Sequence, residues 1–147
     1  MKALVAFFFM LSLINAPAWQ LNFEQAKTEA KGSNKLILLN FSGSDWCGPC
    51  IKLKKEVFES DAFATYADQH LVLVRADFPR SKKNQLSPQQ TTHNESLAER
   101  YNPEGQFPLT VLIDANGKAL KQWVGYPAAL TVQTLVNEID AQHVAAH

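Results

Sequence analysis

Three compact apolar runs divide the chain into blocks, with longer mixed or polar stretches between them. Each run is rich in Leu, Ile, Val or Phe and too short for a helix, which is typical of a strand buried on both faces. These runs span residues 35–41, 71–77 and 109–114. Asn116 and Gly117 follow the third run as a strong hairpin signal, so residues 119–124 are predicted to return as an antiparallel strand.

Helical spacing of apolar residues is found between and after these strands. Asn22, Ser87 and Thr131 each offer a side-chain cap at the start of a helix, and Gly32 is expected to end the first one. The predicted helices span residues 23–31, about 47–59, 88 to about 101, and a last segment from 132 onward. This alternation predicts an α/β fold in which helices cover both faces of a mixed central sheet.

The first residues have the pattern of a targeting segment rather than of a folded element. Lys2 precedes an apolar run over residues 3–14, and Ala16-Pro17-Ala18 offers a small-x-small site for cleavage after Ala18. A membrane anchor is the alternative, but a spanning helix needs about 20 apolar residues and this run is shorter. We therefore expect a signal peptide over residues 1–18, a single domain over residues 19–147, and export to the periplasm.

Composition narrows the range of functions. The 147-residue chain carries 14 basic and 14 acidic side chains, so it lacks the positive surface typical of nucleic-acid-binding proteins. Its two cysteines are too few for a disulfide-stapled miniprotein or for a complete four-cysteine zinc site. We expect a monomer without an organic cofactor or a bound metal, and the two cysteines become the central question.

Trp46-Cys47-Gly48-Pro49-Cys50 carries the strongest chemical signal in the chain. The motif follows a predicted buried strand and opens a predicted helix, whose unpaired amides and dipole favour a thiolate at Cys47. Cys50 lies one turn further along, where it can attack a mixed disulfide on Cys47. Pro49 is tolerated in a first helical turn, Gly48 leaves the surface beside Cys47 open, and Trp46 is expected to shield the thiolate and to contact substrate.

A metal site is the competing interpretation of the two cysteines. Cys-x-x-Cys supplies two thiolates, and the usual zinc sites need two more Cys or His ligands. The remaining candidate ligands are His70, His93, His143 and His147. None of them forms a closely spaced pair near the motif, which favours redox chemistry. A purely structural disulfide would close almost no loop and would add little stability.

The motifs together resemble those of exported thioredoxin-like proteins, in particular the periplasmic DsbH-type oxidoreductases and the C-terminal domain of DsbD. The resemblance rests on Phe41-Ser-Gly-Ser-Asp-Trp-Cys-Gly-Pro-Cys50, Ala76-Asp-Phe-Pro79, Gly105-Gln-Phe-Pro108 and Ile113-Asp-Ala-Asn-Gly-Lys118. It spans nearly all of the chain after residue 18. It implies a single thioredoxin fold and thiol–disulfide exchange with protein substrates.

The resemblance also implies roles for residues outside the cysteine motif. Pro108 matches the cis-proline that faces the cysteines in thioredoxins, although its spacing alone favours an ordinary trans proline at a strand start. Phe107 replaces a smaller residue and should alter partner choice. Asn40 stands where thioredoxins carry a buried Asp that helps move a proton off the resolving cysteine. Because Asn cannot accept that proton, a hydrogen-bonded structural role is expected for it. Arg75 matches the region of a buried Lys.

These observations predict an exported thiol–disulfide oxidoreductase. Cys47 attacks a substrate disulfide, and Cys50 resolves the mixed disulfide to leave the two cysteines bonded to each other. Gly48 and Pro49 match the pair found in reducing thioredoxins, so we expect a protein-disulfide reductase that a membrane thiol donor recharges. The alternatives are an isomerase or oxidase of the same fold, and a redox-inert or metallochaperone binding module.

Overall fold

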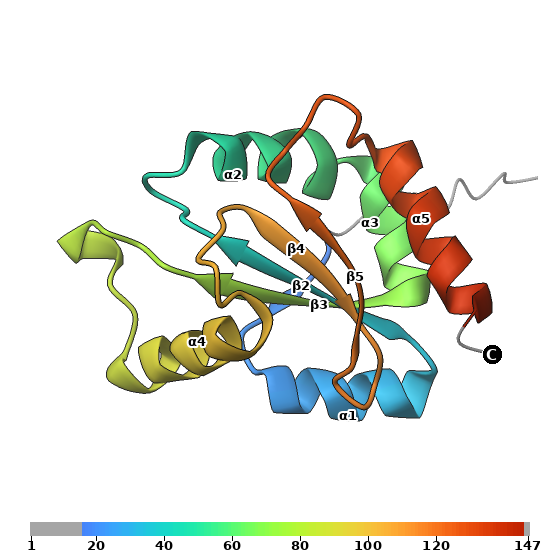
Figure 1. The fold of residues 1–147 in the computed structure, drawn as a ribbon, viewed down its shortest axis with the longest axis horizontal. Coiled ribbons are helices and arrows are strands. Elements are labelled where there is room, and N and C mark those ends of the chain that lie inside the picture. Colours follow the sequence, from blue (N-terminus) through green and yellow to red (C-terminus); the bar gives the residue numbers. More distant parts are fainter. Residues whose placement is uncertain (1–15, 146–147) are drawn as a thin grey trace, which may run out of the picture.

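The computed structural model describes residues 16–145, so the predicted signal segment lies outside the described residues except for its last three positions. Within them, a five-stranded sheet has the order β1-β3-β2-β4-β5 (Figure 1). The strands are β1 (Trp19–Gln20), β2 (Leu36–Ser42), β3 (Leu71–Asp77), β4 (Leu109–Ile113) and β5 (Ala119–Val124). β3 pairs in parallel with β1 and β2, whereas β4 pairs antiparallel with β2 and with β5. The sheet is therefore mixed, as the sequence predicted.

Helices cover both faces of this sheet, which confirms the predicted architecture. They are α1 (Phe23–Ser33), α2 (Gly48–Leu53), α3 (Asp61–His70), α4 (Pro88–Tyr101) and α5 (Val132–Ala145). α1 and α4 pack on one face, and α2, α3 and α5 pack on the other (Figure 1). No helix within residues 16–145 has the length and apolar character needed to cross a membrane.

Strand alternation decides which side chains meet which helices. Ile37, Leu39 and Phe41 of β2 enter the core beneath α1 and α4, whereas Leu36 and Leu38 enter the core beneath α2, α3 and α5. Because successive side chains of a strand point to opposite faces, the residue between Leu39 and Phe41 lies on the α2 face. That residue is Asn40, and its position on this face places a polar group next to the cysteine motif.

Polar side chains begin the helices at the predicted positions. The Asn22 side chain accepts a hydrogen bond from the Gln25 amide at 3.1 Å, and Ser87 accepts one from the Gln90 amide at 3.1 Å. Caps of this kind contribute about 1 kcal/mol each to helix stability. They explain why the chain enters α1 and α4 at the residues that the sequence indicated.

The end of α1 differs from the prediction. The helix passes Gly32 and continues to Ser33, and Asn34 closes it with a left-handed backbone, φ 55°. Asn adopts this conformation more readily than most residues other than Gly, because its short polar side chain can hydrogen-bond locally. Asn34 therefore takes the terminating role that was expected of Gly32.

The helix predicted over about 47–59 is divided into separate segments. α2 ends at Leu53 and continues as a short π-helical segment, η1 (Lys54–Phe58). Ser60 then caps α3, a helix that the sequence analysis did not separate, by accepting a hydrogen bond from the Phe63 amide at 3.2 Å. Loops from β2 and β3 meet at the start of α2, where the cysteine motif lies.

Candidate active site

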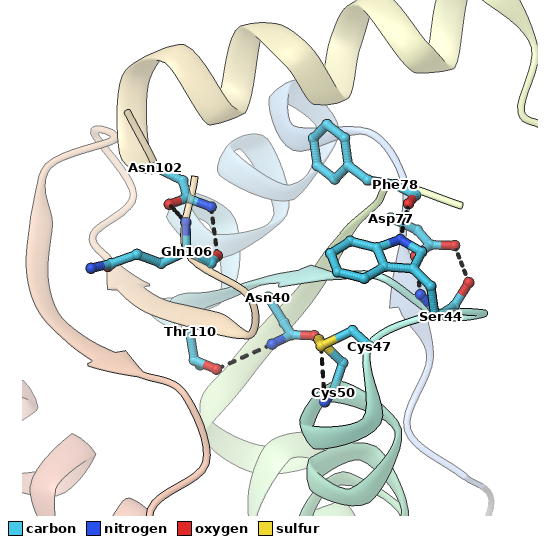
Figure 2. Close-up of a disulfide and its surroundings, with 10 residues drawn as sticks. Asn40, Ser44, Cys47, Cys50, Asp77, Phe78, Asn102, Gln106 and Thr110 are labelled. Atoms are coloured by element: carbon cyan, nitrogen blue, oxygen red, sulfur yellow. Dashed lines mark hydrogen bonds between the residues drawn. A yellow bond between two sulfur atoms is a disulfide. The ribbon is translucent and has the colours of Figure 1, made fainter. Parts of the chain in front are cut away.

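A disulfide joins Cys47 and Cys50 at the start of α2 (Figure 2). Their Cα atoms are 5.2 Å apart, and Cys47 is the residue that caps the helix. The Cys50 amide donates a hydrogen bond to Cys47 Sγ at 3.3 Å. An N–H group aimed at this sulfur stabilises negative charge on it, so the same geometry favours a thiolate at Cys47 once the disulfide is reduced.

The exposed fractions of the two cysteines are almost equal, so they do not show which sulfur attacks substrate. Cys47 is 4% exposed and Cys50 is 3% exposed. Gly48 and Pro49 between them are exposed, and a Cβ added at Gly48 would meet no atom within 4 Å. The surface beside the disulfide is therefore open at Gly48. The capping position of Cys47, rather than its accessibility, supports its assignment as the attacking residue.

A row of polar side chains crosses the sheet next to the disulfide. Asn40 on β2 is in register with Arg75 on β3 and with Thr110 on β4. Asn40 is 3% exposed, and its Nδ2 donates a hydrogen bond to Thr110 Oγ1 at 3.1 Å (Figure 2). The resemblance indicates Asn40 and Arg75 as site residues, whereas Thr110 joins them only through the strand register. The signal for Thr110 was a lone polar residue within the apolar run of β4.

Arg75 places a cation in this row. Its guanidinium carbon lies 4.2 Å from the ring centroid of Trp19 and 6.0 Å from that of Phe58. Its Nε and Nη2 are buried and have no hydrogen-bond partner among the described residues. Burial lowers the pKa of Arg75, while the charges of Asp77 and Glu59 act in the opposite direction. An arginine still keeps its proton in such surroundings, so this part of the row cannot act as a base.

The loop before β4 carries Pro108, which is buried at the start of the strand. The Phe107–Pro108 peptide bond is cis, which is the geometry that the resemblance implied. Asn102 fixes the preceding turn, since its Nδ2 donates to the Gln106 carbonyl at 2.8 Å and its Oδ1 accepts from the Gln106 amide at 2.8 Å (Figure 2). The Pro108 carbonyl accepts a hydrogen bond from the Gly125 amide at 2.8 Å. Both ends of the loop are thus held.

Aromatic rings form a wall that joins two of the predicted site residues. The ring centroids of Trp46 and Phe107 are 5.4 Å apart, and those of Phe107 and Phe78 are 5.5 Å apart, both edge to face. Trp46 Nε1 also donates to the Phe78 carbonyl at 2.7 Å. A Cβ added at Gly43 would overlap the Trp46 indole, so only glycine leaves room for this ring. Phe78, which lies just after β3, was not assigned to the site from the sequence.

Asp45 ties the loop after β3 to the cysteine loop. Its Oδ1 accepts from the Arg80 amide at 2.9 Å, and its Oδ2 accepts from the Ser81 amide at 2.9 Å and from Asn84 Nδ2 at 3.0 Å. These donors, with that from Arg80 the strongest, hold the pKa of Asp45 below its ordinary value. Nothing in the local sequence pattern marks this carboxylate or its three distant partners.

Asp77 makes a second connection between the same two loops. Its carboxylate accepts from the Ser44 amide at 2.9 Å and from the Ser44 hydroxyl at 2.5 Å (Figure 2). Because Asp77 ends β3 and Ser44 precedes the cysteine motif, these bonds fix the motif to the C-terminal end of β3. Within residues 16–145, no group of three or more His, Cys, Asp or Glu side chains is placed to hold a metal ion.

Comparisons with known proteins agree with this geometry. A sequence model described as a thioredoxin-like domain matches residues 23–139. The chain is 39% identical over 102 residues to the disulfide bond reductase DsbH of Chlamydia pneumoniae, which covers 69% of this chain and 59% of that protein. The chain therefore spans less than two thirds of the length of this relative.

Two solved structures share the fold. A DsbH oxidoreductase superposes with a TM-score of 0.79 at 28% identity, covering 98% of this chain and 94% of that one. The oxidised C-terminal domain of Neisseria meningitidis DsbD superposes with a TM-score of 0.55 at 15% identity, covering 80% of this chain and 90% of that one. With a family match that extends from α1 into α5, the chain belongs to the thioredoxin-like domain family.

Proposed function

We propose that this protein is an exported thiol–disulfide oxidoreductase that reduces disulfides in protein substrates. The observation that carries the proposal is the Cys47–Cys50 disulfide at the start of α2, with the Cys50 amide donating to Cys47 Sγ. The naming of the relative DsbH as a disulfide bond reductase supports the direction of the reaction. Gly48 and Pro49 support it too, because neither adds a positive charge that would stabilise the Cys47 thiolate further.

The reaction begins with both cysteines reduced. The Cys47 thiolate attacks one sulfur of a substrate disulfide, that bond breaks, and the departing substrate thiolate takes up a proton. Cys50 then loses its proton and attacks the Cys47 sulfur of the mixed disulfide. The second substrate thiolate leaves and is protonated, and the Cys47–Cys50 bond forms. The substrate gains two electrons and two protons. The protein supplies both electrons and the Cys50 proton, and the second proton comes from water because Cys47 reacts as a thiolate.

The polar row next to the disulfide has a structural part in this scheme. Asn40 and Thr110 bond to each other, and neither side chain is a base near neutral pH. The proton of Cys50 therefore passes to the departing substrate thiolate or to water. Asn40 and Thr110 hold β2 and β4 together beside the reacting sulfurs, and the wall of Trp46 and Phe107 bounds the site where substrate docks.

The proposal extends to the cellular setting. Residues 1–18 are a cleaved signal peptide, the mature protein acts in the periplasm as a monomer, and a membrane thiol donor returns electrons to it. The dithiol carries the redox chemistry without a further cofactor. The name of the relative DsbH, a disulfide bond reductase, supports the need for an electron donor, because an oxidising compartment reoxidises a dithiol and so requires a dedicated source of electrons.

Two measurements on the exported protein test the proposal. With excess reductant it should reduce the disulfides of insulin in the presence of a metal chelator, and Cys47→Ser should abolish this activity. Its reduction potential should lie below about −200 mV, towards thioredoxin at about −270 mV. A potential near about −120 mV would assign the protein to the oxidants of this fold. Failure to reduce insulin would favour a binding module instead.

A further inference from the structure

The segment after β3 is fixed in place beside the cysteine motif. Trp46 Nε1 donates to the Phe78 carbonyl, and the Asp45 carboxylate accepts from the backbone amides of Arg80 and Ser81. A short 3-10 helix, η2 (Lys82–Asn84), follows, and Asn84 completes the attachment through its side chain. The position of Arg80 relative to the active site is therefore set by directed hydrogen bonds rather than by a free loop.

The Arg80 side chain lies across the indole of Trp46. Its guanidinium carbon is 3.7 Å from the ring centroid, close enough for a cation–π contact. Arg80 is exposed, and among residues 16–145 its side chain forms no ion pair with a carboxylate. Within residues 16–145, Arg80 donates a hydrogen bond only from its backbone amide, so its side-chain N–H groups remain available, and these groups match the two oxygens of a carboxylate.

Several other charges in this region are already engaged, whereas Lys55, Lys82 and Lys83 are exposed and form no ion pair within residues 16–145. Lys52 and Lys54 are paired with Glu56 and Glu59 at 3.9 and 3.4 Å. The carboxylates of Asp45 and Asp77 accept hydrogen bonds from uncharged donors of the two loops. Arg80 differs from these groups because its charge is held in place while its hydrogen-bonding edge has no partner within the described part of the chain.

We propose that Arg80 is a specificity-determining residue that favours protein substrates with an Asp or Glu close to the cysteine under attack. The inference rests on the proposed function. Trp46 directly precedes Cys47, so a group stacked on its indole lies within reach of residues that flank the substrate sulfur in a mixed disulfide. Because the segment is already ordered, little conformational entropy is lost when Arg80 binds a carboxylate. Asp45 acts as a positioning residue through the backbone of Arg80.

The test uses three disulfide-linked peptides that differ only in a Glu, Gln or Lys next to the cysteine. The reduced full-length exported protein should show kcat/KM in the order Glu, Gln, Lys, with about a three- to tenfold span between the extremes at low salt. Arg80→Gln should remove this order while leaving reduction of the Gln peptide nearly unchanged. Salt at about 1 M, where the screening length falls to about 3 Å, should compress the order in the unmodified protein.

Lys83→Gln is the matched control, since it removes the same charge from an exposed residue of η2 that lies in the same segment. This variant should reduce the three peptides with the same order of kcat/KM as the unmodified protein. Asp45→Asn should reduce the differences in kcat/KM among the three peptides without stopping reduction of the Gln peptide. If Asp45→Asn does not fold, the result with Arg80→Gln decides the test alone.

Several outcomes would overturn the proposal, and they are distinguishable. Equal rates for the three peptides with the unmodified protein would refute the preference while leaving the proposed function intact. An equal slowing of all three by Arg80→Gln would show that Arg80 acts on the chemistry or the fold. Loss of the order in Lys83→Gln as well would show a diffuse charge effect. No reduction of any peptide would refute the proposed function and this inference together.

Discussion

Asn40 donates a hydrogen bond to Thr110 at 3.1 Å, and both side chains lie in the buried layer next to the Cys47–Cys50 disulfide (Figure 2). The bond crosses from β2 to β4, so it links the strand that leads to the cysteines with the strand that follows Pro108. It also occupies the place where the resemblance to thioredoxins leads one to expect a carboxylate. The protein therefore has a neutral, satisfied pair there rather than a proton acceptor.

Thr110→Val should lower the free energy of unfolding by about 1–3 kcal/mol, because it leaves Asn40 Nδ2 buried without its acceptor. The double variant Asn40→Leu/Thr110→Val removes both polar partners and should be less destabilised than the sum of the two single changes. Denaturant unfolding of the four proteins measures the coupling. Strictly additive effects would show that the hydrogen bond contributes little.

Asn40→Asp should accelerate release of substrate from the mixed disulfide near neutral pH, because a carboxylate at this place can accept the Cys50 proton. The same change should destabilise the protein by about 1–3 kcal/mol, since it buries a group whose charged form has lost its hydration. Single-turnover release of a peptide thiol measures the first effect and denaturant unfolding measures the second. An unchanged release rate would show that the Cys50 proton leaves without help from this position.

Local signals were sufficient for most of the fold. The apolar runs predicted β2, β3 and β4, and the Asn116-Gly117 turn predicted the return into β5. These elements are predictable because a buried strand or a tight turn depends mainly on a few consecutive residues. β1 was missed because Trp19 and Gln20 form a strand only by pairing with β3. α3 was missed because apolar residues continue past the π-helical segment, although Ser60 marks its true start.

The candidate site also contains some residues that a local motif predicts and others that depend on tertiary contacts. A contiguous motif predicts Cys47, Cys50 and the residues between them as candidate site residues, whereas the residues that surround this motif in space are far from it in the sequence. Asp45 and Arg80 are 35 positions apart, and Asn40 and Thr110 are 70 apart. Each of these contacts depends on how two loops or strands are brought together, so the residue types alone could not identify the pairs.

Gly43→Ala should displace the Trp46 indole and lower stability by about 1–3 kcal/mol, because the added Cβ would overlap the ring. Gly48→Ala is the matched control, since a Cβ there meets no atom within 4 Å. NMR of the indole N–H groups should report loss of the Trp46 bond to the Phe78 carbonyl in the first variant alone. Equal stability of the two variants would contradict close packing of Gly43 against the Trp46 indole.

Asp45 should give the protein a pH-dependent contribution to stability. Its pKa in the folded state lies below its ordinary value of 3.8, chiefly because the Arg80 amide donates to the carboxylate. The contribution is therefore fully present above the unfolded pKa and is lost as the pH falls through the folded pKa. The difference in unfolding free energy between the unmodified protein and Asp45→Asn should be largest near neutral pH and should shrink in acid. A difference that is constant with pH would contradict this role.

Variants that retain only one of the two cysteines should differ in how much mixed disulfide they accumulate with substrate proteins. If Cys47 attacks and Cys50 resolves, Cys50→Ser should accumulate mixed disulfides with substrate proteins, because the Cys47 thiolate still forms but nothing releases the substrate. Cys47→Ser should accumulate few, since the remaining thiol lacks the position at the helix start where the amide of residue 50 stabilises a thiolate. Non-reducing gels of exported protein, with the double Ser variant as the background, measure the difference. Since the two residues are almost equally buried, at 4% and 3% exposure, accessibility predicts no such asymmetry. The reverse trapping pattern would assign attack to Cys50 and would mean that capping of α2 does not decide which sulfur reacts.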